Sequence, residues 1–516
     1  MMQEIEIVCL PEEHENQEAL KAIAATKLKL APKRIHDLKI RKRSIDARGR
    51  KVVYRMQVQV FLDEPAPPTS FNIDYPSVKD KKPVIIVGAG PAGIFAALQC
   101  ILSGHKPIIL ERGKDVKQRR RDLANINKQG LVNPESNYCF GEGGAGTYSD
   151  GKLYTRSTKR GDVNQVLQMF VAHGATEDIL VDARPHIGTN KLPHIITAMR
   201  ETILNAGGEF MFDTKVTALD IQFGNITGVK TAAGDIIQAN AVILATGHSA
   251  RDVFEMLHRQ NVLIEAKPFA LGVRIEHPQE IIDKAQYHCD IRGEHLPPSY
   301  YSLVEQVDDR GVFSFCMCPG GIIAPCSTEP VEIVVNGWSP SKRNNPFANS
   351  GTVVQINIED IAGNNADPFK LLRFQKQVEQ IAFTVGGGNL VAPGQRMVDF
   401  VEGRFSADIP KNSYLPGVAS SNLKDVLPTW IHQRLQKALP AFGRKMKGYY
   451  TNEALLVGVE SRTSSPIKIP RDRDTMQHPQ ITGLYPCGEG AGYAGGIISA
   501  AIDGMNCALA AVKQLT

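Results

Sequence analysis

Cys316 and Cys318, separated by a single residue, are the first residues whose types and spacing could do chemistry. A dithiol at this spacing could exchange electrons with a redox partner, and one thiolate could act as a nucleophile or an acid. The alternative is that both are small core residues beside a turn, because free cysteines are usually buried and inert. Arg462 is the third candidate catalytic residue, since arginine can clamp a carboxylate through two hydrogen bonds. A structural salt bridge from Arg462 to Glu460 or Glu489 is an equally good interpretation.

A glycine-rich turn follows a predicted buried strand at 84–87 and precedes a predicted helix. The first glycine allows a tight turn, the second lets the backbone approach a pyrophosphate, and the third lets helix and strand pack closely. Free N–H groups at the start of the helix would face the phosphates. A second predicted strand, at 107–110, ends in an acid that can bind an adenosine ribose. The predicted contacts of this dinucleotide-binding unit are Gly88, Gly90, Pro91, Ala92, Gly93, Glu111 and Arg112.

The segment 483–498 indicates which dinucleotide is bound. A short predicted strand ends in Gly488-Glu489, where an acid can hold the ribityl hydroxyls of a flavin chain. A helix of small residues then begins, and its N–H donors would face the flavin edge on which negative charge appears on reduction. An NAD-only dehydrogenase needs neither device, so FAD is the predicted cofactor. The predicted contacts here are Gly488, Glu489, Gly496, Ile497 and Ile498.

The loop 141–151 is too rich in glycine for an exposed linker of ordinary composition. Its backbone N–H groups could line the pyrophosphate or the flavin face. The alternative, a flexible surface loop, is less favoured because the segment follows the first βαβ unit. A predicted strand at 241–245 and another at 215–221 supply further contacts, the latter through its backbone to the adenine. These additional predicted contacts are Gly146, Ser149, Lys152, Val216, Ala245, Thr246 and Gly247.

Together these motifs resemble the FAD flavoproteins with two dinucleotide folds. More narrowly, the segments 140–152, 185–189, 316–321 and 460–466 are similar to a bacterial group of uncharacterised FAD-dependent dehydrogenases. The resemblance covers nearly the whole chain, and it implies non-covalently bound FAD and redox chemistry. This chain has Glu489 where many FAD proteins have aspartate, and the longer acid can still reach a ribityl chain.

The elements that must position these residues predict an α/β fold with a discontinuous Rossmann-like FAD-binding domain. Its two parts are predicted at residues 76–265 and 450–516, with an inserted α+β substrate-side domain at 266–449 between them. A small N-terminal α+β domain of βαββ order is predicted at 1–75, where the proline-rich run 64–69 marks a linker. Within these parts, helices are predicted at 16–28, 192–205 and 368–383, and strands at 5–10, 35–45, 52–60, 331–335 and 353–358.

Composition sets limits on the class of protein. The chain has 516 residues, 42% hydrophobic and 22% charged, as in an ordinary soluble protein. No signal peptide or bilayer-spanning stretch is visible, and the nine cysteines show no CxxC pair or metal-ligand spacing. We therefore expect a cytoplasmic protein with no metal and no membrane contact. No second strand-GxGxxG-helix unit is present, so NAD(P)H, if it is the electron donor, must bind without its own Rossmann domain.

A basic run in the N-terminal domain suggests a different partner, either RNA or an acidic protein. Acidic residues interrupt the run, aromatic residues for stacking bases are scarce, and most charge runs are solvated faces.

The favoured function is an FAD-dependent oxidoreductase that transfers a hydride between flavin N5 and a small-molecule substrate. The alternatives are a flavoprotein that acts with RNA and a thiol-redox flavoprotein that uses the two cysteines. The sequence specifies neither the substrate nor the number of subunits. The RNA alternative rests on the basic run of the N-terminal domain, which consists of Lys39, Arg41, Lys42, Arg43, Arg48, Arg50 and Lys51.

Overall fold

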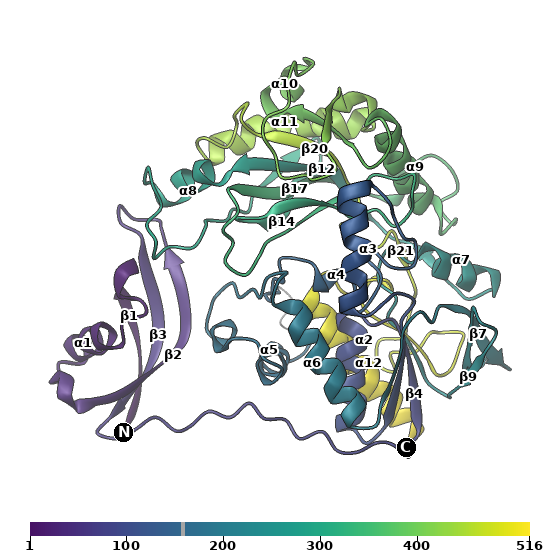
Figure 1. Cartoon of the computed structure of the whole chain (residues 1–516), viewed down its shortest axis with the longest axis horizontal. Helices are drawn as coiled ribbons and strands as arrows, with labels where there is room; N and C mark the ends of the chain where they lie inside the picture. The colour runs from purple at the N-terminus through teal and green to yellow at the C-terminus, as the bar shows by residue number, and fades with distance from the viewer. Residues whose placement is uncertain (156–159) are drawn as a thin grey trace.

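The computed structural model describes residues 1–155 and 160–516 of a mixed α/β chain (Figure 1). A parallel sheet has the order β22-β10-β4-β5-β6. Its central strand, β4, is apolar and almost fully buried because both of its faces are covered. On one face Val84 and Ile86 pack with the helices α2, α6 and α12, and on the other Ile85 and Val87 pack toward β7, β8 and α7. The strands are β4 (Pro83–Val87), β5 (Lys106–Leu110), β6 (Glu209–Met211), β10 (Val242–Leu244) and β22 (Leu484–Pro486).

Several helices and a small antiparallel meander surround this sheet. The predicted strand-turn-helix-strand unit is confirmed as β4, α2 and β5, and the predicted helix 192–205 is confirmed as α6. A β-carbon at Gly504 would lie 2.0 Å from the carbonyl oxygen of Ala92, so α12 and α2 cross in close backbone contact. The helices are α2 (Pro91–Leu102), α3 (Val116–Gln129), α4 (Gly144–Thr147), α5 (Val163–Ala172), α6 (Leu192–Asn205), α7 (Arg251–Arg259) and α12 (Ile497–Leu515). The antiparallel meander is β7 (Val216–Gln222), β8 (Asn225–Thr231) and β9 (Ile236–Gln238).

A seven-stranded sheet lies above these elements in Figure 1, with the order β13-β14-β17-β12-β20-β18-β19. Two short strands, β11 (Glu265–Ala266) and β21 (Ile467–Lys468), pair where the chain passes to and from it. β20 lies in this sheet, so the predicted segment 450–516 does not lie entirely with the parallel sheet. The strands are β12 (Phe269–Pro278), β13 (Val304–Val307), β14 (Arg310–Cys318), β17 (Phe347–Ile356), β18 (Ala392–Arg396), β19 (Val418–Ser420) and β20 (Leu455–Glu460). The accompanying helices are α8 (Gln279–Tyr287), α9 (Lys370–Val385), α10 (Met397–Glu402) and α11 (Thr429–Lys445).

The strand predicted at 331–335 is wrong, and the one predicted at 353–358 is displaced. β16 (Val335–Trp338) begins where the first was predicted to end, and it pairs with β15 (Ile322–Pro325). The residues 331–334, which precede β16, do not pair with any described strand. Instead, the N–H of Ile333 donates to the carbonyl oxygen of Glu379 on α9. β17 begins earlier than predicted because it pairs with β12 along ten residues of each strand.

The N-terminal residues form β1 (Met2–Cys9), α1 (Gln17–Leu28), β2 (Ile35–Asp46) and β3 (Val53–Leu62), with the sheet order β1-β3-β2. One contact of this sheet with the rest of the chain is made by Arg43, whose N–H donates to the carbonyl oxygen of Val181. The Arg43 side chain also pairs with Asp178 and Asp182 at 3.0 and 2.7 Å. Part of the predicted basic surface is therefore used inside the protein, and an RNA partner is not favoured.

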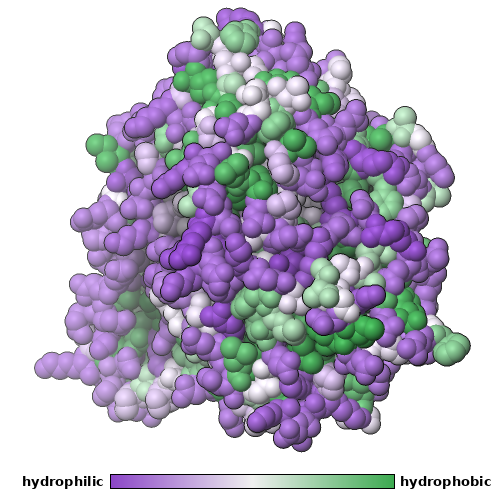
Figure 2. All heavy atoms as spheres, turned by 45° about the vertical axis from the view of Figure 1, so that its right-hand side comes forward, coloured by the Kyte–Doolittle hydropathy of each residue, from purple (hydrophilic) through white to green (hydrophobic). Residues whose placement is uncertain are grey.

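The outer surface matches the composition. The face drawn in Figure 2 is mostly hydrophilic, with apolar side chains in separate groups between polar ones. Among the helices of the two described stretches, none combines the length and the apolar character needed to cross a bilayer.

Candidate cofactor site and its surroundings

The three glycines of the first turn differ in what surrounds them. Gly88 has φ +106°, and a β-carbon there would lie 2.4 Å from the carbonyl oxygen of Ala245. A β-carbon at Gly93 would lie 1.9 Å from the carbonyl oxygen of Gly88. A β-carbon at Gly90 would lie 4.0 Å from its nearest described neighbour, so of these three glycines Gly90 is the one with room beside it. No side chain of the described residues caps α2, whose first N–H groups remain available to a ligand.

The Glu111 carboxylate fastens the turn to the glycine-rich loop. It accepts hydrogen bonds from the N–H groups of Ala89 at 2.8 Å, and of Gly113 and Gly141 at 2.9 Å each. Sequence reasoning predicted Glu111 as a ribose contact and missed this second role. The signal available was only its position at the end of β5.

Three helix starts, far apart in the sequence, converge here. A β-carbon at Gly146, in α4, would lie 3.2 Å from Pro91 at the start of α2 and 3.4 Å from Ile497 at the start of α12. A β-carbon at Gly488 would lie 3.0 Å from the side chain of Ala92. The predicted contacts from the first turn, the loop and the C-terminal segment are therefore neighbours.

Two polar groups in this region have no hydrogen-bond partner in the part of the chain that the structure describes. Within residues 1–155 and 160–516, the Glu489 carboxylate makes no hydrogen bond or ion pair, and the buried hydroxyl of Thr246 has no hydrogen-bond partner. Thr246 adjoins the first turn, because a β-carbon at Gly88 would lie 3.3 Å from its Cα. Gly495 and Gly496 are exposed with open space beside them, and no described side chain caps α12. These groups fit FAD, whose hydroxyls and ring edge would supply the missing partners.

Burial raises the pKa of Glu489 to about 8 from an ordinary value of 4.5, against the opposing effect of nearby Lys267. Between these two values the folded apoprotein keeps a proton that the unfolded chain has lost. Its free energy of unfolding should therefore decrease as pH rises through this window. We expect the melting temperature of apoprotein Glu489→Gln to fall less than that of the wild type from pH ~5 to ~8. Exposed Glu453→Gln is the control, and identical slopes for wild type and Glu489→Gln would contradict the expectation.

An ion pair that sequence reasoning missed holds the end of β22. Asp503 on α12 accepts a hydrogen bond from the N–H of Gly488 at 2.7 Å and pairs with Arg471 at 2.6 Å. Asp503 also lies with Cys487 and Cys507 in a group whose ligand atoms are within 4.8 Å. Arg471 Nη1 is 3.3 Å from the Cys507 sulfur, so a guanidinium already provides the positive charge there.

Two predicted cofactor contacts, Arg112 and Val216, also make contacts within the protein. Arg112 forms two hydrogen bonds of 2.8 Å with Asp252 and one of 2.6 Å with Glu135, and its guanidinium lies over Phe140. Val216 opens β7 with its side chain buried in the core. The charge of Arg112 is already neutralised by the carboxylates of Asp252 and Glu135.

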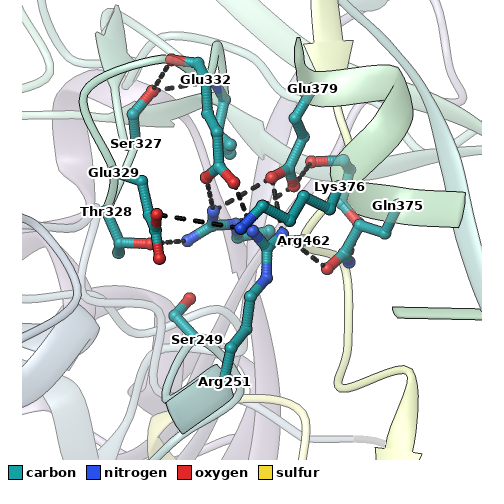
Figure 3. Close-up of polar contacts among 12 residues, drawn as sticks. Ser249, Arg251, Ser327, Thr328, Glu329, Glu332, Gln375, Lys376, Glu379 and Arg462 are labelled. Atoms are coloured by element: carbon teal, nitrogen blue, oxygen red, sulfur yellow. Dashed lines mark hydrogen bonds and ion pairs between the residues drawn. The ribbon is translucent and has the colours of Figure 1, made fainter. Parts of the chain in front are cut away.

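Arg462 belongs to a buried cluster of two arginines and two glutamates (Figure 3). It pairs with Glu332 at 2.9 Å and with Glu379 at 3.1 Å, and Arg251 pairs with the same two carboxylates. The predicted partners, Glu460 and Glu489, are therefore wrong. Glu460 instead pairs with a different arginine on β12, at 2.9 Å. All the guanidinium nitrogens of Arg462 have partners, which leaves its charge balanced before any substrate arrives.

Lys152 lies beside the two candidate cysteines. Its Nζ is 3.4 Å from the Cys316 sulfur and 3.5 Å from the Cys318 sulfur. The sequence predicted Lys152 as a cofactor contact and the cysteines as separate catalytic candidates, and the fold brings the three residues together. The remaining loop contact, Ser149, donates to the carbonyl oxygen of Gly146 at 2.7 Å.

A cavity lies where the loop 141–151 faces β15, β16 and the end of β20. Its lining includes Ser149, His248, Trp338, Glu460 and Arg462. Burial lowers the pKa of His248 to about 4, so its imidazole is neutral near pH 7. Burial raises the pKa of Glu460 to about 7, against the pull of its arginine partner. The cavity therefore offers one carboxyl group, Glu460, that titrates near neutral pH, and one neutral imidazole, His248.

Comparisons with known proteins match parts of this chain to two FAD-dependent families. Residues 192–315 match the family described as FAD dependent oxidoreductase, and residues 268–463 match the family described as FAD-dependent protein, C-terminal domain-like. Residues 1–61 match a domain of unknown function. An uncharacterized protein of Clostridium beijerinckii is 39% identical over 502 residues, which cover 93% of each chain.

Among solved structures, similarity is distant. Glycine oxidase from Bacillus cereus is 13% identical with a TM-score of 0.30, and the match covers 84% of this chain and 96% of that one. A geranylgeranyl bacteriochlorophyll reductase-like protein from Thermoplasma acidophilum is 12% identical with a TM-score of 0.34, covering 84% and 79%. The sequence matches carry the assignment: the chain belongs to the family of the Clostridium beijerinckii protein and is an FAD-dependent oxidoreductase, with FAD as its cofactor.

Proposed function

We propose that the elements around the parallel sheet form one discontinuous FAD-binding domain and that the seven-stranded sheet belongs to an inserted substrate-side domain. The diphosphate would lie at the start of α2, beside Gly90. The ribityl chain would bind the carboxyl group of Glu489, and the ring would lie at the start of α12. The observation that carries this proposal is the convergence of the α2 and α12 starts at Gly146, beside a carboxyl group that has no partner among the residues the structure describes.

The protein residues then have defined tasks. The uncapped N–H groups of α2 bind negative phosphate oxygens, and those of α12 stabilise negative charge on the ring edge. When bound, FAD supplies two-electron chemistry, which we propose to be hydride transfer between its N5 atom and a small-molecule substrate. The substrate would enter the cavity lined by His248 and Glu460. Neutral His248, hydrogen-bonded through Nδ1 to Ser249, could accept a substrate proton at Nε2.

The test is an anaerobic titration of the purified protein. We expect yellow protein whose flavin absorption is bleached by NADH, NADPH or a member of a metabolite panel, and restored by an oxidant. His248→Gln should retain FAD and slow bleaching by the organic substrate roughly 100-fold or more, as loss of a proton acceptor does. Retention of FAD with no bleaching by any organic compound or nicotinamide would contradict the proposed hydride transfer.

A further inference from the structure

Cys316 and Cys318 lie at a distortion in β14 that turns two thiols toward one ammonium group. Pairing of β14 with β17 shifts register between Phe315 and Cys318, which marks an extra residue in the strand. Cys316 has φ +46°, a backbone conformation that a non-glycine residue rarely adopts. In a regular strand, the Cα atoms of residues two apart lie ~6.7 Å from each other, which is the upper end of the Cα–Cα range that a disulfide spans. The bulge bends the strand between Cys316 and Cys318, so their spacing departs from that of a regular strand.

The two sulfurs are not equivalent. Cys316 is partly exposed, whereas Cys318 is buried. The single S–H proton of Cys318 can be donated to the carbonyl oxygen of Cys316, 3.3 Å away, or to the Cys316 sulfur when that sulfur is a thiolate. Lys152 contacts both sulfurs, and Arg274 on β12 lies 3.5 Å from the Cys318 sulfur. Hydrogen bonding from Cys318 and these two cations lower the pKa of Cys316 well below its ordinary value, while the pKa of Cys318 is raised.

We propose that Cys316 and Cys318 form a thiol–disulfide exchange site that takes small organic disulfides as ligands, with Cys316 as the attacking thiolate. The Cys316 sulfur attacks one sulfur of the ligand, forms a mixed disulfide and releases a thiolate. The Cys318 sulfur then attacks Cys316 and releases the second half of the ligand, which leaves with the proton of Cys318. The protein dithiol loses two electrons to the ligand, and a small dithiol returns them by the reverse exchange.

Charged groups on several elements surround this pair. The cations are Lys152 and Arg274, and Lys152 is itself held by Asp150 at 3.5 Å. The carboxyl groups of Asp150, Glu460 and Glu489 are near enough to oppose the thiolate or to respond to it. Because Lys152 is the cation that touches both sulfurs, it has the largest expected effect on the attacking thiol.

The first test follows release of the coloured thiol from dithiobis-nitrobenzoate by the full-length, FAD-loaded protein. The wild type should release two equivalents rapidly and retain none, because Cys318 resolves the mixed disulfide. Cys318→Ser should release one equivalent and keep the other half as an adduct at Cys316, found by mass spectrometry. Cys316→Ser should lose the rapid phase, whereas Cys289→Ser, which changes a half-buried cysteine packed against the N-terminal sheet, should keep it.

The second test measures the pH profile of the rapid phase in Lys152→Met. We expect the half-maximal pH of the rate to move upward, and the rate at pH ~6 to fall roughly 3-fold for each unit of rise in thiol pKa. An unchanged profile, a rapid phase that persists in Cys316→Ser, or a stable wild-type adduct with no second release would each overturn the proposal. Mapping the oxidised wild-type peptide by mass spectrometry gives the same answer if a variant fails to fold. Because these readouts follow sulfur, they distinguish failure of this site from failure of flavin reduction.

Discussion

Gly90→Val should lose tight FAD binding while the apoprotein keeps its fold. Among the described residues, a β-carbon at Gly90 meets no atom closer than 4.0 Å, and the φ of −74° is one that valine adopts. The added side chain would instead occupy the space that we assign to the diphosphate. We expect a cost of about 3 kcal/mol, which is roughly 100-fold in affinity. Flavin content after purification and titration of the apoprotein with FAD measure the effect.

Two other glycine variants make the comparison specific. Gly93→Ala should destabilise the apoprotein itself, because its β-carbon would lie 1.9 Å from the carbonyl oxygen of Gly88. Gly293→Val, at an exposed position with open space, should change neither FAD affinity nor the melting temperature. If Gly90→Val bound FAD as the wild type does, the diphosphate could not lie against this turn.

The first βαβ unit could be predicted because its signals are local. A run of buried apolar residues, three glycines at fixed spacing and an acid after the next strand all fall within 28 residues, from Val84 to Glu111. Gly93, the third glycine, is constrained by an equally local contact. A β-carbon there would collide with the carbonyl oxygen of Gly88, five residues earlier in the chain. The existence and type of such elements follow from short-range constraints.

The contacts between distant segments could not be predicted. Arg462 was paired with glutamates near it in the sequence, yet its partners lie 130 and 83 residues away. Lys152 meets two cysteines that lie 164 and 166 residues along the chain. The apolar letters of 331–335 predicted a strand, but Glu332 is drawn into a buried ion cluster instead. Each outcome depends on how two sheets are placed relative to each other, and no periodicity in one segment records that placement.

Arg462→Met should destabilise the protein strongly, because it leaves two buried glutamates with one arginine. The wild-type cluster balances Arg251 and Arg462 against Glu332 and Glu379, which are fully buried. Removing one partner of a buried ion pair typically costs about 3–5 kcal/mol. The melting temperatures of wild type and variant, each measured with and without FAD, test this expectation.

The matched control is the double variant Arg462→Met/Glu379→Gln, which removes one charge of each sign and should recover part of the lost stability.

The pH dependence of this stability has a defined sign. The two arginines hold the pKa of Glu379 at about 2, against its burial, so the wild type gains stability from this carboxylate above its ordinary pKa and loses that gain as pH falls toward 2. In Arg462→Met that pKa should rise, because one of the two cations is gone, and protonation would then relieve the unpaired charge. The difference in melting temperature between wild type and variant should therefore shrink from pH ~6 to ~4. If the difference in melting temperature stayed constant from pH ~6 to ~4, the unpaired charge would not be the cause of the destabilisation.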